Sequence, residues 1–161
     1  MNRQELIRSF AAGPRLLRET LNNLPPDMWQ WKPAPDRWSV HEIIIHMPDS
    51  EASGYVRLRK IIAEPGSTLG AYDQEAFTDK LPYHQLDIDT ALELFSRMRE
   101  LSVQLLEHVE ESVWLHKAIH EEHGEVDLDW WLRCYEEHVG LHITQMKRNM
   151  AEWEAAGRPK V

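Results

Sequence analysis

The amino-acid sequence predicts an all-α fold, a four-helix bundle that forms one domain over residues 1–161. Four long segments repeat apolar residues every three or four positions, which is the period of an amphipathic helix. No segment shows convincing strand alternation. Two connections are long, so the bundle need not run simply up and down.

The first helix is expected over residues 2–22, and Gly13-Pro14 predicts a kink inside it. Its apolar stripe consists of Leu6, Phe10, Leu17 and Leu21, with Leu24 just beyond. Residues 24–38 follow, with four prolines and three tryptophans. This composition indicates an ordered loop packed on the core rather than a flexible linker.

The second helix is expected over residues 40–63. Ser39 and Glu42 form a capping box, in which the Ser39 hydroxyl accepts from the Glu42 amide and the Glu42 carboxylate reaches back. Pro48 removes the hydrogen bond to the carbonyl of Ile44, so we expect an interruption and a kink there.

The third helix is expected over residues 89–110. The connection before it, residues 64–88, has no clear period and is expected to be functional or a crossover. Residues 114–126 are polar and rich in histidine, and their turn at Gly124 is compatible with a short hairpin. The fourth helix begins near Asp127 or Asp129, either of which could cap it, and continues to Trp153.

Composition restricts the partners of the chain. It has 27 acidic and 18 basic residues, a formal charge of −9, which argues against nucleic acid and anionic lipid. The one cysteine, Cys134, excludes an intrachain disulfide and fits a reducing compartment. No segment resembles a signal peptide or a membrane span. We therefore expect a cytoplasmic protein with no nucleic-acid or membrane partner.

Two histidines on the fourth helix, His138 and His142, can aim their imidazoles at one point because residues four apart share a helix face. Gly140 between them costs about 1 kcal/mol against Ala, and we expect it to mark the close approach of a backbone or a ligand. His46 on the second helix is the candidate third ligand, since facing helices can bring ligands together. Three protein ligands would leave open positions, as in a catalytic metal site.

Chance is the alternative explanation for this spacing, because the chain has nine histidines. His116 and His120 form another such pair, which we interpret as surface residues in a polar stretch. The run His120-Glu121-Glu122-His123 lacks one residue of the helical zinc-protease spacing. Spacing alone therefore leaves metal binding open.

Two motifs in a fixed order carry a resemblance. Trp38-Ser-Val-His-Glu-Ile-Ile-Ile-His46-Met-Pro-Asp-Ser50 comes first, and His138-Val-Gly-Leu-His142-Ile-Thr-Gln145 follows near the end. Together they resemble the DinB-like superfamily of metal-binding four-helix bundles over almost the whole chain. Residues 70–77 (Gly-Ala-Tyr-Asp-Gln-Glu-Ala-Phe) and the turn at residues 120–126 are similar to the YfiT branch. That branch includes bacillithiol S-transferase-like proteins and proteins described as metal-dependent hydrolases.

The resemblance implies an up-down-down-up bundle, often a homodimer, with one divalent metal on three histidines, here His46, His138 and His142. Imidazole suits several metals, and we expect zinc or nickel, with iron as an alternative. The chain has Met47-Pro48-Asp49 where YfiT-like chains typically read Leu-Ala-Asp after the first ligand, which would tilt His46.

Further site residues are expected around these ligands. Asp49, one turn past His46, is a candidate general base, although helix solvation also explains it. Glu42 and Gln145 are candidates to orient ligand rings, although the capping box already explains Glu42. Trp38 is expected to be core or pocket wall. Cys134 lies on the ligand face, and we interpret it as a small buried hydrophobe rather than a nucleophile.

We therefore expect a metal-dependent enzyme, a thiol S-transferase or a hydrolase, that acts on a small molecule. In the transferase version the metal site would bind a low-molecular-weight thiol. The competing hypothesis is a non-catalytic metal-binding or stress-response bundle that acts through assembly.

Overall fold

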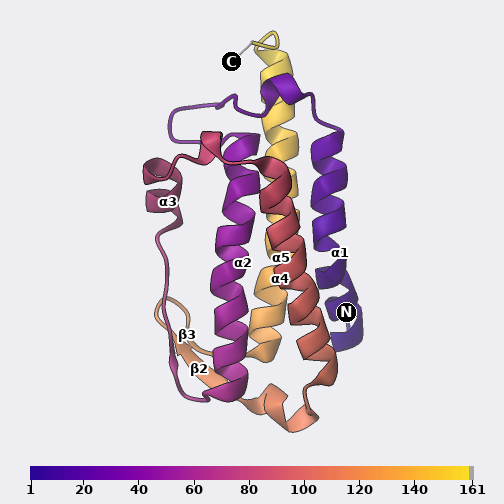
Figure 1. The fold of residues 1–161 in the computed structure, drawn as a ribbon, viewed down its shortest axis with the longest axis vertical. Helices are drawn as coiled ribbons and strands as arrows, with labels where there is room; N and C mark the ends of the chain where they lie inside the picture. The colour runs from indigo at the N-terminus through magenta and orange to yellow at the C-terminus, as the bar shows by residue number, and fades with distance from the viewer. Residues whose placement is uncertain (160–161) are drawn as a thin grey trace.

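The computed structural model describes residues 1–159. Four long helices form the bundle: α1 (Arg3–Asn22), α2 (Val40–Ala63), α4 (Ile88–His108) and α5 (Leu128–Ala155). In Figure 1, α1 and α5 run upward while α2 and α4 run downward, so the predicted up-down-down-up arrangement is confirmed. The helices begin and end within a few residues of the predicted limits.

Local sequence signals account for the helix ends. Ser39 and Glu42 make the predicted capping box at the start of α2, and Asn2 and Glu5 make a second one at the start of α1. Of the two candidate caps for α5, Asp127 accepts from the Trp130 amide. The α2 helix runs through Pro48 without the interruption that we expected.

The two long connections contain more structure than the sequence predicted. The crossover between α2 and α4 holds β1 (Thr68–Leu69), the short helix α3 (Gln74–Lys80) and a 3₁₀ turn (Tyr83–Gln85). The expected hairpin is present as β2 (Lys117–His120) and β3 (Gly124–Asp127). β1 pairs parallel to β2, with Leu69 opposite His120, and β2 pairs antiparallel to β3, with His120 opposite Gly124.

The Trp-rich connection, residues 23–39, crosses the upper end of the bundle in Figure 1 and contains one 3₁₀ turn, Pro26–Met28. Trp38 is buried, and Trp29 and Trp31 pack against the core, as expected for an ordered loop. No helix in residues 1–159 is long and apolar enough to cross a membrane.

Candidate metal centre

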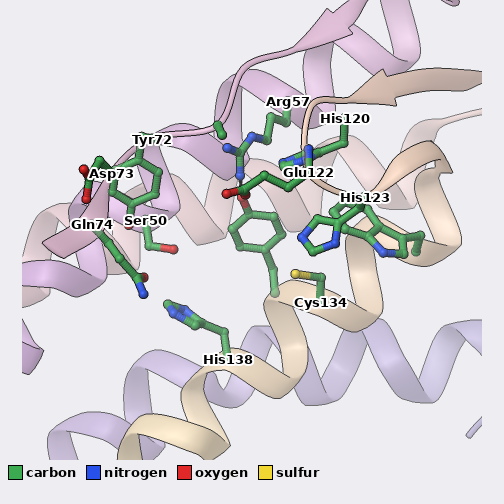
Figure 2. A pocket seen from close by; sticks show the side chains of 13 residues that line it. Ser50, Arg57, Tyr72, Asp73, Gln74, His120, Glu122, His123, Cys134 and His138 are labelled. Atoms are coloured by element: carbon green, nitrogen blue, oxygen red, sulfur yellow. Dashed lines mark hydrogen bonds between the residues drawn. The ribbon is translucent and has the colours of Figure 1, made fainter.

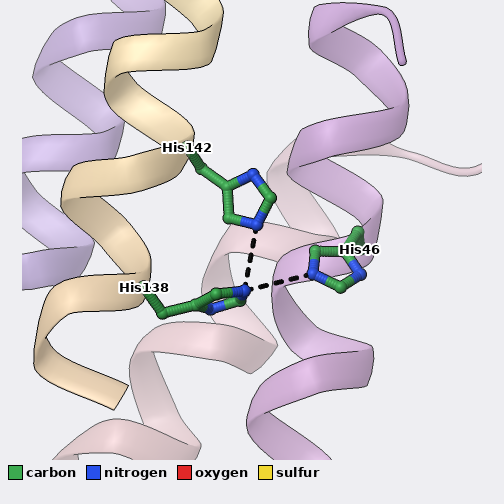
Figure 3. Close-up of side chains that lie close together, drawn as sticks. All are labelled: His46, His138 and His142. Atoms are coloured by element: carbon green, nitrogen blue, oxygen red, sulfur yellow. Dashed lines mark hydrogen bonds between the residues drawn. The ribbon is translucent and has the colours of Figure 1, made fainter. Parts of the chain in front are cut away.

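Three histidine rings meet between α2 and α5 (Figure 3). Nε2 of His138 lies 3.3 Å from Nε2 of His46 and 2.9 Å from Nε2 of His142. His46 is fully buried and His142 is 9% exposed. The structure therefore brings together the three residues that the sequence suggested as ligands.

A neighbouring side chain defines where the ring proton of His142 lies. Nδ1 of His142 lies 3.0 Å from the side-chain oxygen of Gln145, which can only accept a hydrogen bond. The Tyr72 hydroxyl lies 3.3 Å from Nδ1 of His46. With its proton on Nδ1, His142 presents a lone pair at Nε2, the form in which imidazole binds a metal, and a Tyr72 hydroxyl that accepts from Nδ1 of His46 gives the same form there.

The spacing of the nitrogens fits a metal ion. Two nitrogens bound at about 2.0–2.1 Å are about 3.3 Å apart in tetrahedral geometry and about 2.9 Å apart in octahedral geometry. The observed separations of 3.3 and 2.9 Å cover both cases. Without an ion, His138 can donate from Nε2 to only one of its two neighbours, whereas a cation would be held by all three rings.

Burial keeps these rings uncharged. It lowers the pKa of His46 to about 3, with a further contribution from the nearby His142. It also lowers the pKa of His138, and that of His142, where the hydrogen bond to Gln145 acts in the opposite direction. The rings are therefore neutral at pH 7 and ready to bind a cation.

Aromatic and glycine contacts hold the two ligand helices in place. The Trp38 ring lies 4.7 Å from the His46 ring and stacks on the His142 ring at 6.0 Å, so it packs beside two of the three histidines and lines the smaller cavity. At Gly54 on α2, a Cβ would collide with the ring of Tyr135, one turn before His138. Gly54 thus allows α2 and α5 to approach closely.

Gly140 does not have the role that we expected. A Cβ placed there would meet no atom within 4 Å, so neither a helix nor a wall of the site approaches it. The position lies on the exposed side of α5. The glycines that allow close approach are Gly54, which the sequence did not single out, and Gly13, for which the sequence predicted only a kink with Pro14.

Two cavities adjoin the histidine cluster, and His138 and Gln74 line both of them. The larger, about 560 Å³, extends from His138 toward Arg57 and His120 (Figure 2). The smaller, about 340 Å³, is lined by His142, Gln145 and Trp38, among others. His138 therefore separates two spaces that can each hold a small molecule.

The other candidate site residues are Asp49, Glu42 and Cys134. Asp49 accepts a hydrogen bond from the Tyr83 hydroxyl and lines neither cavity. The Glu42 carboxylate binds the Ser39 amide and Lys32, and no described hydrogen bond joins it to His46. Cys134 is exposed and lines the larger cavity, so our interpretation of a buried hydrophobe was wrong.

A second group of potential ligands, His120, Glu122 and His123, lies at the hairpin turn. His120 is 2% exposed, so our interpretation of it as a surface residue was wrong. Its Nδ1 accepts from the Glu122 amide at 3.1 Å, which places the proton of the neutral ring on Nε2. This is a hydrogen-bond donor rather than a free ligand, so the first cluster is the better candidate metal centre.

Sequence reasoning missed three residues of the site: Tyr72, Gln74 and Arg57. All three line the larger cavity. Tyr72 and Gln74 belong to the segment that resembles the YfiT branch, which was a usable signal. In the sequence, Arg57 has the spacing of a solvent-exposed charge on an amphipathic helix, so no signal distinguished it.

The fold and the site define a class of protein, a four-helix bundle with a three-histidine candidate metal centre on facing helices. The model of the DinB superfamily matches residues 9–146, which include all three histidines. The chain belongs to the DinB superfamily.

Similar proteins carry names that refer to metal. A protein of Oceanobacillus iheyensis named "Putative metal-dependent hydrolase OB0782" is 24% identical over 142 residues, covering 88% of this chain and 82% of that protein. A Bacillus mycoides protein also named "Putative metal-dependent hydrolase" is 26% identical over 116 residues, covering 70% and 66%. Both similarities include a large part of the helical bundle.

One solved structure has the same fold. YfiT from Bacillus subtilis, described as "a probable metal-dependent hydrolase with an unusual four-helix bundle topology", superposes with a TM-score of 0.85 at 17% identity. The match covers 97% of this chain and 88% of that chain.

Proposed function

We propose that this protein is a metal-dependent enzyme that acts on a small molecule. His46, His138 and His142 would hold one divalent transition metal, zinc or nickel, with iron as the alternative. One observation carries the proposal: the Nε2 atoms of the three histidines converge. Gln145 lies beside Nδ1 of His142, and Tyr72 lies beside Nδ1 of His46. When bound, such an ion would lower the pKa of a bound thiol or water and act as a Lewis acid.

Thiol S-transfer is the reaction that the cavities favour. A transferase must hold two substrates at once, and the two cavities meet at His138 and Gln74. A low-molecular-weight thiol in one cavity would face an electrophilic small molecule in the other. The chain would bind and orient both partners and exclude bulk water from the buried rings.

Hydrolysis is the second candidate, favoured by the names of the relatives. Asp49 stays a candidate general base for it. Because Asp49 lines neither cavity, its carboxylate would first have to move toward the histidines, and the hydrogen bond from Tyr83 opposes that movement. This requirement makes hydrolysis through Asp49 the less favoured reaction.

A non-catalytic bundle that acts through assembly is the remaining alternative. Such a bundle would not need cavities beside the histidines. Because two cavities lie there, we rank this alternative below the enzyme. A homodimer and a cytoplasmic location stay predictions from the resemblance and from composition.

The test is an assay of thiol conjugation to a generic electrophile by metal-loaded protein, with and without chelator. We expect activity with at least one cellular thiol, its loss with chelator, and its loss in His142→Ala. A panel of esters, assayed in parallel, identifies a hydrolase. Metal-loaded protein that is inert toward all thiols and esters would contradict the enzyme and favour the non-catalytic bundle.

A further inference from the structure

Arg57 presents a fixed guanidinium to the larger cavity. Its Nε and Nη2 donate to the Gly70 carbonyl at 3.2 and 2.6 Å, and Nη1 donates to the Tyr135 hydroxyl at 3.0 Å. These bonds use three of the five N–H groups of a guanidinium, so two remain. No carboxylate of residues 1–159 forms an ion pair with Arg57.

His120 adds a second donor beside Arg57. Its Nδ1 accepts from the Glu122 amide, so the neutral ring carries its proton on Nε2. The described hydrogen bonds give this Nε2 no acceptor, and the side chain lines the same cavity. Burial and then the charge of Arg57 lower the pKa of His120, which keeps the ring neutral at pH 7.

The donors and the histidine cluster lie at opposite ends of one space. In Figure 2, His138 borders the cavity on one side, and Arg57 and His120 border it on the other. A small molecule that fills the cavity would therefore touch both ends. Guanidinium pairs best with a planar carboxylate, which can accept two parallel N–H bonds.

We propose that Arg57, assisted by His120, binds a carboxylate of the small molecule whose reacting end lies at His138. This inference rests on the proposed function and narrows its substrate class to acidic small molecules. Asp73 and Glu122 also line the cavity, and Glu122 lies at the same end as Arg57 and His120 (Figure 2), so its charge opposes the attraction of Arg57 for an acid. A positively charged group of the ligand would be directed toward these two carboxylates.

The test uses protein loaded with cobalt(II) and a series of ω-mercaptocarboxylates of increasing chain length, each compared with its primary amide. Calorimetry measures the dissociation constants, and the sulfur-to-cobalt absorption band reports whether the thiol reaches the metal. We expect at least one acid to bind about tenfold more tightly than its amide, the effect of one hydrogen-bonded charge pair. Arg57→Met should abolish this difference and leave the binding of the amide unchanged.

Glu122→Gln is the matched variant, because it removes the opposite charge from the same cavity. It should strengthen acid binding and leave amide binding unchanged, a result that loss of folding cannot produce. Equal binding of acids and amides, or a preference that survives in Arg57→Met, would overturn the inference. Equal dissociation constants for acid and amide, with an absorption band for both, would overturn the inference while supporting a thiol at the metal. A preference for acids seen by calorimetry without any absorption band would support the carboxylate site and count against thiol chemistry.

Discussion

Arg99 donates from Nη1 to the carbonyl oxygen of Phe10 at 3.1 Å in the interior of the bundle. That carbonyl has no helical partner because Pro14, four residues later, lacks an N–H. Nη2 of Arg99 donates to Glu51 at 2.9 Å and to the Tyr135 carbonyl at 2.8 Å. One buried side chain on α4 therefore joins α1, α2 and α5, close to the turn of α5 that carries His138.

Arg99→Met should destabilise the protein by about 3–5 kcal/mol, because Glu51 would remain as an uncompensated buried charge. Both side chains are at most 1% exposed. Denaturant unfolding measures the effect, and Arg97→Met on the exposed side of α4 is the control, with a change below about 0.5 kcal/mol. A double variant with Glu51→Met should recover part of the loss. A loss below about 1 kcal/mol in Arg99→Met would contradict this role.

Two glycines should respond to alanine in opposite directions. Gly13→Ala should destabilise, by about 1–3 kcal/mol, because its methyl group would collide with the Arg99 guanidinium. Gly140→Ala should stabilise, by about 0.5–1 kcal/mol, since nothing lies within 4 Å and alanine favours the helix. Thermal unfolding of the pair measures both signs. A destabilised Gly140→Ala variant would contradict this prediction, because it would mean that another part of the protein packs closely against Gly140.

Gln145→Leu should weaken metal binding about 10-fold to 100-fold, because Nδ1 of His142 would lose the acceptor that holds its proton. Competition with a chromophoric chelator measures the affinity. Gln104→Leu on the exposed side of α4 is the control and should bind metal as the wild type does. Equal affinities in the two variants would show that Gln145 does not orient the ligand.

Metal binding at pH 6 should release few protons from the three histidines. A histidine with its ordinary pKa near 6.5 is about three-quarters protonated at pH 6, so three of them would release roughly two protons. Burial lowers all three pKa values, that of His46 to about 3, so the folded site is already largely deprotonated. Calorimetry at pH 6 in buffers of different ionisation enthalpy counts the protons. Release of roughly two would contradict the neutral state of the rings.

The sequence predicted the features that depend on short-range pattern. The four helices follow from apolar spacing, and the start of α2 follows from the Ser39 and Glu42 capping box. The three histidines followed from spacing together with the resemblance, since nine histidines make a chance pair common.

Features that depend on tertiary contact were not predictable in this way. The short helix α3 has too few turns to show a period, and β1 has two residues that pair only with the distant β2. Arg57 and Arg99 have the helical spacing of surface charges, and only the fold shows that one lines a cavity and the other is buried. Gly140 and Gly13 likewise differ only in what lies opposite them.

The three-histidine centre is tested by the metal content of purified protein after loading with a divalent transition metal and removal of the excess. We expect about one ion per chain in the wild type, none in His142→Ala, and about one in His108→Ala, which changes an exposed histidine on α4. Circular dichroism should show all three proteins folded. A wild type without bound metal, or a folded His142→Ala variant that retains it, would contradict the three-histidine centre.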